Sequence, residues 1–166
     1  AGVGIINTTE CKVLKTKGKV VELEKLVHTE NLKSNLGIGH TRWATHGEPS
    51  MVNAHPHMNE EKTLFLIHNG IIENYVSLKN GLLEEGYKFV SETDTEVLAH
   101  LIDHYLKIKN DLFQAVRYAL NEVEGTYGIA VIYKNEPNKL VVAKKGSPLV
   151  IGIGKNENFI ASDVNA

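Results

Sequence analysis

Cysteine is nearly absent from this sequence, because only Cys11 of its 166 residues carries a thiol. A single cysteine cannot form a disulfide within the chain, and it cannot supply the paired thiolates of a Cys-x-x-Cys metal site. We therefore expect a protein of a reducing compartment, with a cytoplasmic location.

Two other features are also missing. Basic residues are not in excess, since 18 Lys and Arg stand against 20 Asp and Glu and the net charge is -2. A nucleic-acid-binding surface needs cationic side chains for the phosphates, so we expect no nucleic-acid partner. The sequence also lacks an apolar run of about 18 residues, the length that spans a bilayer, so we expect no membrane association.

The pattern of apolar residues predicts an α+β fold. Hydrophobic residues make up 42% of the chain, enough for one core, and we expect a single domain over residues 1–166. Short β-branched runs predict strands at 2–7, 11–15, 36–42, 63–68, 87–90, 127–133, 140–144, 149–153 and 159–161. Helical spacing predicts helices at 20–27, 71–85, 93–106 and 112–123. Strands on both sides of a helical block favour antiparallel sheets over βαβ units.

Local signals mark three of the boundaries between these elements. Thr93 and Glu96 are three residues apart, the spacing of a capping box at a helix start. Gly86 is placed to end the preceding helix. The turn at residues 135–138 predicts a hairpin between the strands on either side of it.

Arginine is rare, and its rarity draws attention to Arg42. Sixteen of the 18 basic residues are lysine, and the only arginines are Arg42 and Arg117. An arginine in a lysine-rich chain is typical of a place where a carboxylate or phosphate is held by two parallel hydrogen bonds. The alternative is an incidental surface arginine.

Histidines gather in the same part of the chain. Five of the eight lie between Gly37 and Asp94, namely His40, His46, His55, His57 and His68. Imidazoles can bind zinc, but the spacing matches no zinc motif and no cysteine pair is available to help. Histidines that are hydrogen-bonded within a loop are the favoured interpretation, and a metal site is the minority alternative.

Asn69-Gly70 and Asp94 each allow two interpretations. An Asn-Gly pair at the end of a strand is normally a tight turn. The same amide and glycine N–H could instead donate hydrogen bonds to a developing oxyanion. Asp94 lies in the predicted first turn of a helix, where the helix dipole favours acidic side chains. It could equally accept a hydrogen bond from a ligand ammonium group.

Taken together, four segments resemble a known family. They are Gly37–Gly47 (GIGHTRWATHG), Asn53–His57 (NAHPH), His68–Asn74 (HNGIIEN) and Ser91–Glu96 (SETDTE). The chain resembles the class II glutamine amidotransferase domain, and more narrowly the glutaminase domains of the glutamine–fructose-6-phosphate aminotransferases. The resemblance implies an N-terminal-nucleophile hydrolase fold, an αββα sandwich of two antiparallel sheets.

The resemblance also implies a chemistry and a set of site residues. In this family an N-terminal cysteine attacks the glutamine amide, with its own α-amino group as base, and the released ammonia passes to a separate sugar-isomerising domain. Asn69 and Gly70 would form the oxyanion hole, and Asp94 would bind the α-ammonium group. The substrate α-carboxylate would be held by Arg42, with Thr45 and His46 beside it and Trp43 against the substrate. No cofactor and no metal are implied.

The partners implied are L-glutamine, the sugar-isomerising domain, and further copies of the full protein in a homo-oligomer. The family nucleophile precedes the matched segments, and Cys11 lies in a predicted strand without a free α-amine. We therefore expect a glutaminase domain shortened at both ends, without the leading nucleophile strand, and inactive on its own. The alternatives are a non-catalytic glutamine-binding module and, less favoured, a His-cluster metallohydrolase.

Overall fold

The computed structural model describes residues 1–41 and 50–165. Its strands are β1 (Gly2–Ile6), β2 (Cys11–Lys15), β3 (Leu36–His40), β4 (His57–Met58), β5 (Leu64–Ile72), β6 (Gly125–Tyr133), β7 (Leu140–Lys145), β8 (Val150–Ile153) and β9 (Asn158–Ala161). Its helices are α1 (Val20–Thr29), α2 (Tyr75–Glu84), α3 (Asp94–Lys109) and α4 (Leu112–Glu122). The predicted α+β class is confirmed.

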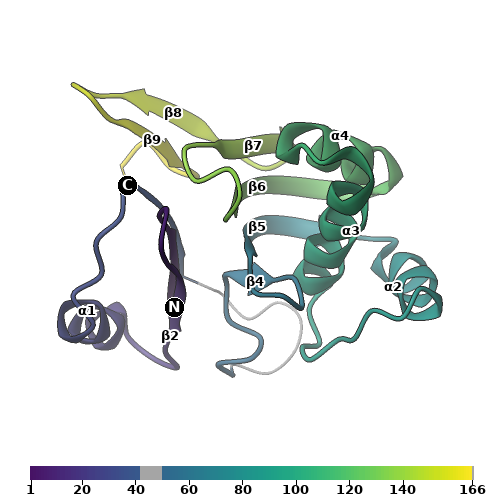
Figure 1. Ribbon diagram of the computed structural model, residues 1–166, viewed down its shortest axis with the longest axis horizontal. Helices are drawn as coiled ribbons and strands as arrows, with labels where there is room; N and C mark the ends of the chain where they lie inside the picture. The colour runs from purple at the N-terminus through teal and green to yellow at the C-terminus, as the bar shows by residue number, and fades with distance from the viewer. Residues whose placement is uncertain (42–49, 166) are drawn as a thin grey trace.

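The strands form two antiparallel sheets and a separate ribbon. The first sheet has the order β2-β1-β3, the second has the order β4-β5-β6-β7, and β8 pairs with β9. Figure 1 shows α1 on the outer side of the first sheet and α2, α3 and α4 on the outer side of the second. The arrangement is the αββα sandwich that the resemblance implies.

Alternation along the strands builds one core on each side of the second sheet. Leu64 and Leu66 of β5 pack among the helices, in the larger cluster. Phe65, between them in sequence, belongs to a smaller cluster with Ile6 and Ile38 of the first sheet. Because successive side chains of a strand point to opposite faces, β5 contributes to both apolar layers.

Helix α3 carries most of the helical side of the core. Eleven of its 16 residues are buried, among them Val97, Leu98, Leu101, Ile102 and Leu106 of the apolar stripe at helical spacing. Tyr105, which belongs to the same stripe, is only partly buried. In the part of the chain that the structure describes, no helix has the length and hydropathy needed to cross a membrane.

The sequence prediction differs from the structure at three elements. Residues 87–90, predicted as a strand, have no regular structure. Tyr87 donates a hydrogen bond to Asp103, and the Phe89 ring packs on His100 4.9 Å away, so this apolar segment is held by α3. The short strand β4 was not predicted. The helix expected at 71–85 begins only at Tyr75, since Ile71 and Ile72 continue β5 and pair with β6.

The capping box at the start of α3 is confirmed in one half only. The Thr93 hydroxyl accepts a hydrogen bond from the Glu96 N–H at 3.3 Å. The Glu96 carboxylate accepts from the N–H groups of Val90 and Ser91, at 3.0 and 2.7 Å, instead of from Thr93. Glu96 therefore fixes the segment before the helix as well as the helix itself. The other boundary signals are confirmed, because α2 ends just before Gly86 and β6 forms a hairpin with β7.

We predict that Glu96 makes stability depend on pH in the acid range. Burial by itself raises the pKa of this carboxyl, but the His100 ring, the Ser91 hydroxyl and the N–H groups of Val90 and Ser91 lower it from 4.5 to about 2. A group whose pKa is depressed by folding stabilises the fold above its unfolded pKa, and that stabilisation is lost as the pH falls towards the folded value.

Between about pH 6 and about pH 3 the Glu96 contribution should fall by about 2 kcal/mol, measured as the free energy of urea unfolding. Glu96→Gln should be less stable near neutral pH and should lose less stability than the wild type over this interval. Equal losses in the two proteins would show that Glu96 does not carry the effect.

Candidate functional site

Asn69 and Gly70 lie inside strand β5 and do not form a turn. In register with β6, Asn69 faces Gly128 and Gly70 faces Tyr127. The tight-turn interpretation of the Asn-Gly pair is therefore wrong. The strand continues to Ile72 because β6 is long enough to pair with all nine residues of β5.

Gly70 is held in a backbone conformation that other residues rarely adopt. Its φ is +139°, and a Cβ at this position would lie 2.1 Å from the Thr126 carbonyl oxygen. No side chain fits in that space, and L-residues are strained at this φ. A glycine is therefore required here for β5 and β6 to approach each other beside Asn69.

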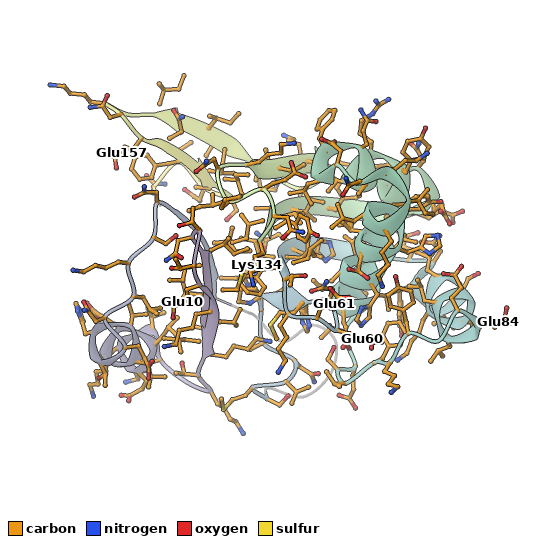
Figure 2. All side chains as sticks on the ribbon, in the orientation of Figure 1. Glu10, Glu60, Glu61, Glu84, Lys134 and Glu157 are labelled. Carbon is orange, nitrogen blue, oxygen red and sulfur yellow. The ribbon has the colours of Figure 1, made fainter. Side chains whose placement is uncertain are left out.

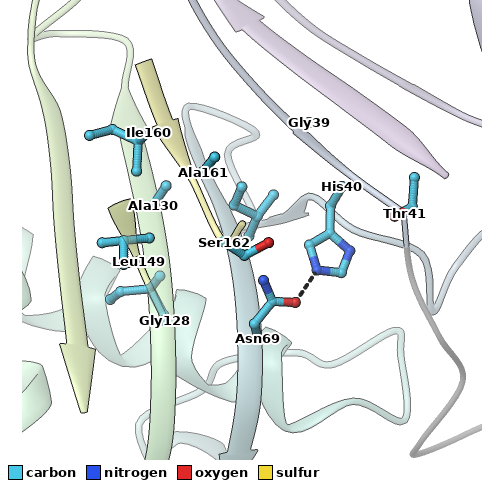
Figure 3. Close-up of a pocket in the computed structure, with 12 residues that line it drawn as sticks. Gly39, His40, Thr41, Asn69, Gly128, Ala130, Leu149, Ile160, Ala161 and Ser162 are labelled. Atoms are coloured by element: carbon cyan, nitrogen blue, oxygen red, sulfur yellow. Dashed lines mark hydrogen bonds between the residues drawn. The ribbon is translucent and has the colours of Figure 1, made fainter. Parts of the chain in front are cut away.

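The Asn69 side chain is oriented by His40. The His40 Nε2 and the Asn69 Oδ1 are 2.8 Å apart, joining the end of β3 to β5. When the imidazole Nε2–H donates to the carboxamide oxygen, the NH2 group of Asn69 is directed away from His40. Figure 3 shows the amide nitrogen on the side of Ser162.

A cavity of about 300 Å³ opens beside this amide. Its walls come from the end of β3, the middle of β5 and of β6, and the end of β9 with the residues just before β8 and just after β9. The residues that line it are Gly39, His40, Thr41, Ile67, Asn69, Gly128, Ile129, Ala130, Leu149, Ile160, Ala161 and Ser162. Its polar groups gather at one end, where Thr41 and Ser162 lie near the His40–Asn69 pair (Figure 3).

Asp94 is the first residue of α3 and is buried, with an exposed fraction of 7%. Its Oδ2 accepts a hydrogen bond of 2.8 Å from the N–H of Ile72, at the end of β5. The carboxylate is thus tied to the strand that carries Asn69 and Gly70. Asp94 is not among the described residues that line the cavity beside Asn69.

The histidines are placed by hydrogen bonds with the threonines at the start of α3. The Thr95 hydroxyl lies 3.0 Å from His55 Nε2 and 3.1 Å from His68 Nδ1. The Thr93 hydroxyl lies 3.0 Å from His57 Nε2. Each of these side chains is buried. The arrangement supports the interpretation of these histidines as architectural.

Burial lowers the pKa of His68, an effect that the nearby Asp94 opposes. The neutral ring donates from Nε2 to the Thr126 carbonyl oxygen, 3.3 Å away, which makes Nδ1 an acceptor for the Thr95 hydroxyl. Within the described ranges, 1–41 and 50–165, no group of three or more His, Cys, Asp or Glu side chains is arranged to hold a metal ion.

Four of the predicted substrate-binding residues lie outside the described residues, namely Arg42, Trp43, Thr45 and His46. His40 was predicted only as a histidine of the cluster, and its contact with Asn69 was missed. A signal existed in the sequence, because His40 lies near the end of the predicted strand 36–42, two residues before Arg42. The hydrogen bonds of Thr93 and Thr95 with the buried histidines could not be predicted, because the only sequence signal at the start of α3 was the helix cap.

Comparisons with known proteins bear on the family of this chain. The model of the glutamine amidotransferase domain family matches residues 40–166. The glutamine–fructose-6-phosphate aminotransferase (isomerizing) of Clostridium tetani is 55% identical over all of this chain. The enzyme of the same name from Chlorobaculum tepidum is 57% identical over 98% of it. The chain spans 27% of the length of each of these relatives.

A solved structure supports the fold independently. The glutamine phosphoribosylpyrophosphate amidotransferase of B. subtilis superposes on 97% of this chain, and on 35% of its own, with a TM-score of 0.81 and 27% identity. The family match covers more than half of the chain and includes Asn69, Gly70 and Asp94. The chain belongs to the glutamine amidotransferase domain family.

Proposed function

We propose that this chain is the glutaminase part of a longer glutamine–fructose-6-phosphate aminotransferase. In that enzyme it hydrolyses L-glutamine to glutamate and supplies ammonia to a sugar-isomerising domain for the synthesis of glucosamine 6-phosphate. The relatives of that name, with 55% and 57% identity, support the proposal. So does their length, since this chain corresponds to 27% of each.

The observation that carries the proposal is the Asn69–Gly70 pair beside a cavity. A carboxamide held by His40 and a glycine in a conformation that other residues rarely adopt are next to each other on strand β5. Preorganised N–H donors of this kind stabilise the oxyanion of a tetrahedral intermediate. Asn69 and Gly70 then act as the oxyanion hole for attack on the glutamine side-chain amide.

The remaining site residues bind the two charged ends of glutamine. Asp94 accepts the α-ammonium group, and Arg42 holds the α-carboxylate, with Trp43, Thr45 and His46 around the substrate. A buried carboxylate at a helix start is suited to a cationic group, because only an opposite charge offsets its desolvation. In the complete enzyme this part works within a homo-oligomer.

The nucleophile in this proposal is a cysteine at the amino end of the complete enzyme, and Cys11 does not replace it. Cys11 lies inside β2, and burial raises the pKa of its thiol, which disfavours the reactive thiolate. It lines a different cavity from the one beside Asn69. The polypeptide of 166 residues alone is therefore inactive.

One experiment tests both statements. The complete gene product should release glutamate from L-glutamine and should be labelled once by a glutamine-like diazoketone at its amino-terminal cysteine. The 166-residue polypeptide, treated in the same way, should release no glutamate and remain unlabelled in a mass spectrum. A complete enzyme without glutaminase activity would contradict the proposed function, whereas labelling of Cys11 in the polypeptide would contradict only its inactivity.

A further inference from the structure

A second cavity, of about 360 Å³, lies beside β2 and shares no lining residue with the cavity beside Asn69. Residues Cys11, Val13 and Lys15 alternate along β2 and line it together. Since Cys11 and Val13 pack against the core between the two sheets, Lys15 is on the same inward face. An ammonium group is thus placed on a face that otherwise carries apolar side chains.

The other walls of this cavity are mostly apolar. Met58 of β4 and Phe65 of β5 form the side that faces β2, and Met51 and Val52 form the rim. The exposed fraction is 56% for Met51 and 50% for Val52. The cavity therefore offers an aliphatic and thioether surface that is open to a small apolar ligand.

Lys15 has no counter-ion among the described residues. It takes part in no ion pair or hydrogen bond there, although the chain has several lysines that do, such as Lys12 with Glu30. The carboxylate that acts on it electrostatically belongs to Glu96, which is already hydrogen-bonded to Val90 and Ser91. Burial lowers the pKa of Lys15 to about 8, against the effect of Glu96.

A second ammonium group, from Lys62, lines the same cavity, and no acidic side chain among the described residues does. Lys62 is exposed and follows β4 in a turn, with a φ of +55°. An anion placed between the apolar walls would receive both positive charges without meeting a carboxylate. It would also offset the cost of leaving the Lys15 ammonium partly desolvated and unpaired.

From these contacts we propose that the cavity beside Lys15 is a binding site for an aliphatic monocarboxylate, whose carboxylate pairs with the Lys15 ammonium and whose chain lies against Met58 and Phe65. The cavity is near the lower end of the range for small-molecule sites, which suits a ligand of about six to eight carbons. Lys62 adds charge at the entrance. The site is independent of the proposed glutaminase function, because it shares no lining residue with the cavity beside Asn69.

Titration calorimetry with octanoate tests the proposal. Octanol, which keeps the aliphatic chain without the charge, and acetate, which keeps the carboxylate without the long chain, are the control ligands. Octanoate should bind at least about tenfold more tightly than either. Lys15→Met should weaken octanoate binding about tenfold or more, because it keeps the apolar stem and removes the charge. Lys155→Met, the same substitution at an exposed site in the turn between β8 and β9, should bind as the wild type does.

A second measurement follows the lysine itself. With lysines carrying 13C-labelled methyl groups, octanoate should raise the pKa of Lys15 in NMR titrations and leave that of Lys155 unchanged. Octanoate affinity that is equal in Lys15→Met and the wild type would overturn the proposal. So would octanol binding as tight as octanoate binding, or an unchanged Lys15 resonance at saturating octanoate.

Discussion

Gly70→Ala should destabilise the protein by more than about 3 kcal/mol, one of the largest effects on stability that we expect from a single methyl group. The new Cβ would lie 2.1 Å from the Thr126 carbonyl oxygen, which is backbone and cannot rotate away. The alanine would also have to adopt a φ of +139°. Strand β5 would have to separate from β6 at the point where Asn69 faces the cavity.

Urea unfolding of matched variants measures this effect. Gly125→Ala meets the Ile71 carbonyl oxygen at 2.1 Å with a φ of +124° and should lose a similar amount of stability. Gly81→Ala is the control, because it is in helix α2 with no atom within 4 Å of the added carbon. It should gain about 0.5–1 kcal/mol, the helix propensity of alanine over glycine. A Gly70→Ala protein as stable as the wild type would show that β5 and β6 are not constrained there.

Asn69→Ala should lower kcat for glutamine hydrolysis in the complete enzyme about 10²–10³-fold, because it removes one of the two oxyanion donors that we propose. The KM for glutamine should change little, since the donor acts on the transition state more than on the bound substrate. Asn135→Ala, in the exposed turn between β6 and β7, is the same substitution away from the site and should keep full activity.

The same assay separates the role of Asn69 from that of Asp94. Asp94→Asn keeps an oxygen that can accept from the Ile72 N–H but removes the charge that we assign to the α-ammonium group. It should raise the KM for glutamine about tenfold or more. If Asn69→Ala changed KM alone, or Asp94→Asn changed kcat alone, the assignment of these two residues would be wrong.

The local sequence pattern predicted two kinds of element correctly: those whose packing or pairing partner is close in sequence, and those whose apolar residues recur with a clear helical period. The apolar stripe of α3, its Thr93 cap and the β6–β7 hairpin are of this kind. Residues 87–90 show where such patterns fail, because their alternation is that of a strand while the backbone N–H of Val90 donates to the Glu96 carboxylate. The Glu96 side chain, six residues after Val90, accepts the hydrogen bond that a neighbouring strand would otherwise accept.

The candidate site could be predicted only through the family resemblance. Asn69-Gly70 is a turn by every local rule, and its place inside β5 depends on the nine-residue pairing with β6, far away in sequence. The His40–Asn69 contact joins residues 29 positions apart, and the His55–Thr95 contact joins residues 40 positions apart. Contacts of this range follow from the packing of whole sheets, which no short segment of sequence encodes.

The alternation of β5 has an evolutionary consequence. Leu66 and His68 face α3, whereas Phe65 and Asn69 face the first sheet. Successive residues of β5 are therefore under selection from different packing partners. Substitutions at the even-numbered positions should co-vary with residues of α3, and those at the odd-numbered positions should co-vary with residues of β3. The helical layer and the layer between the sheets can thus diverge separately among descendants, on either side of a shared strand.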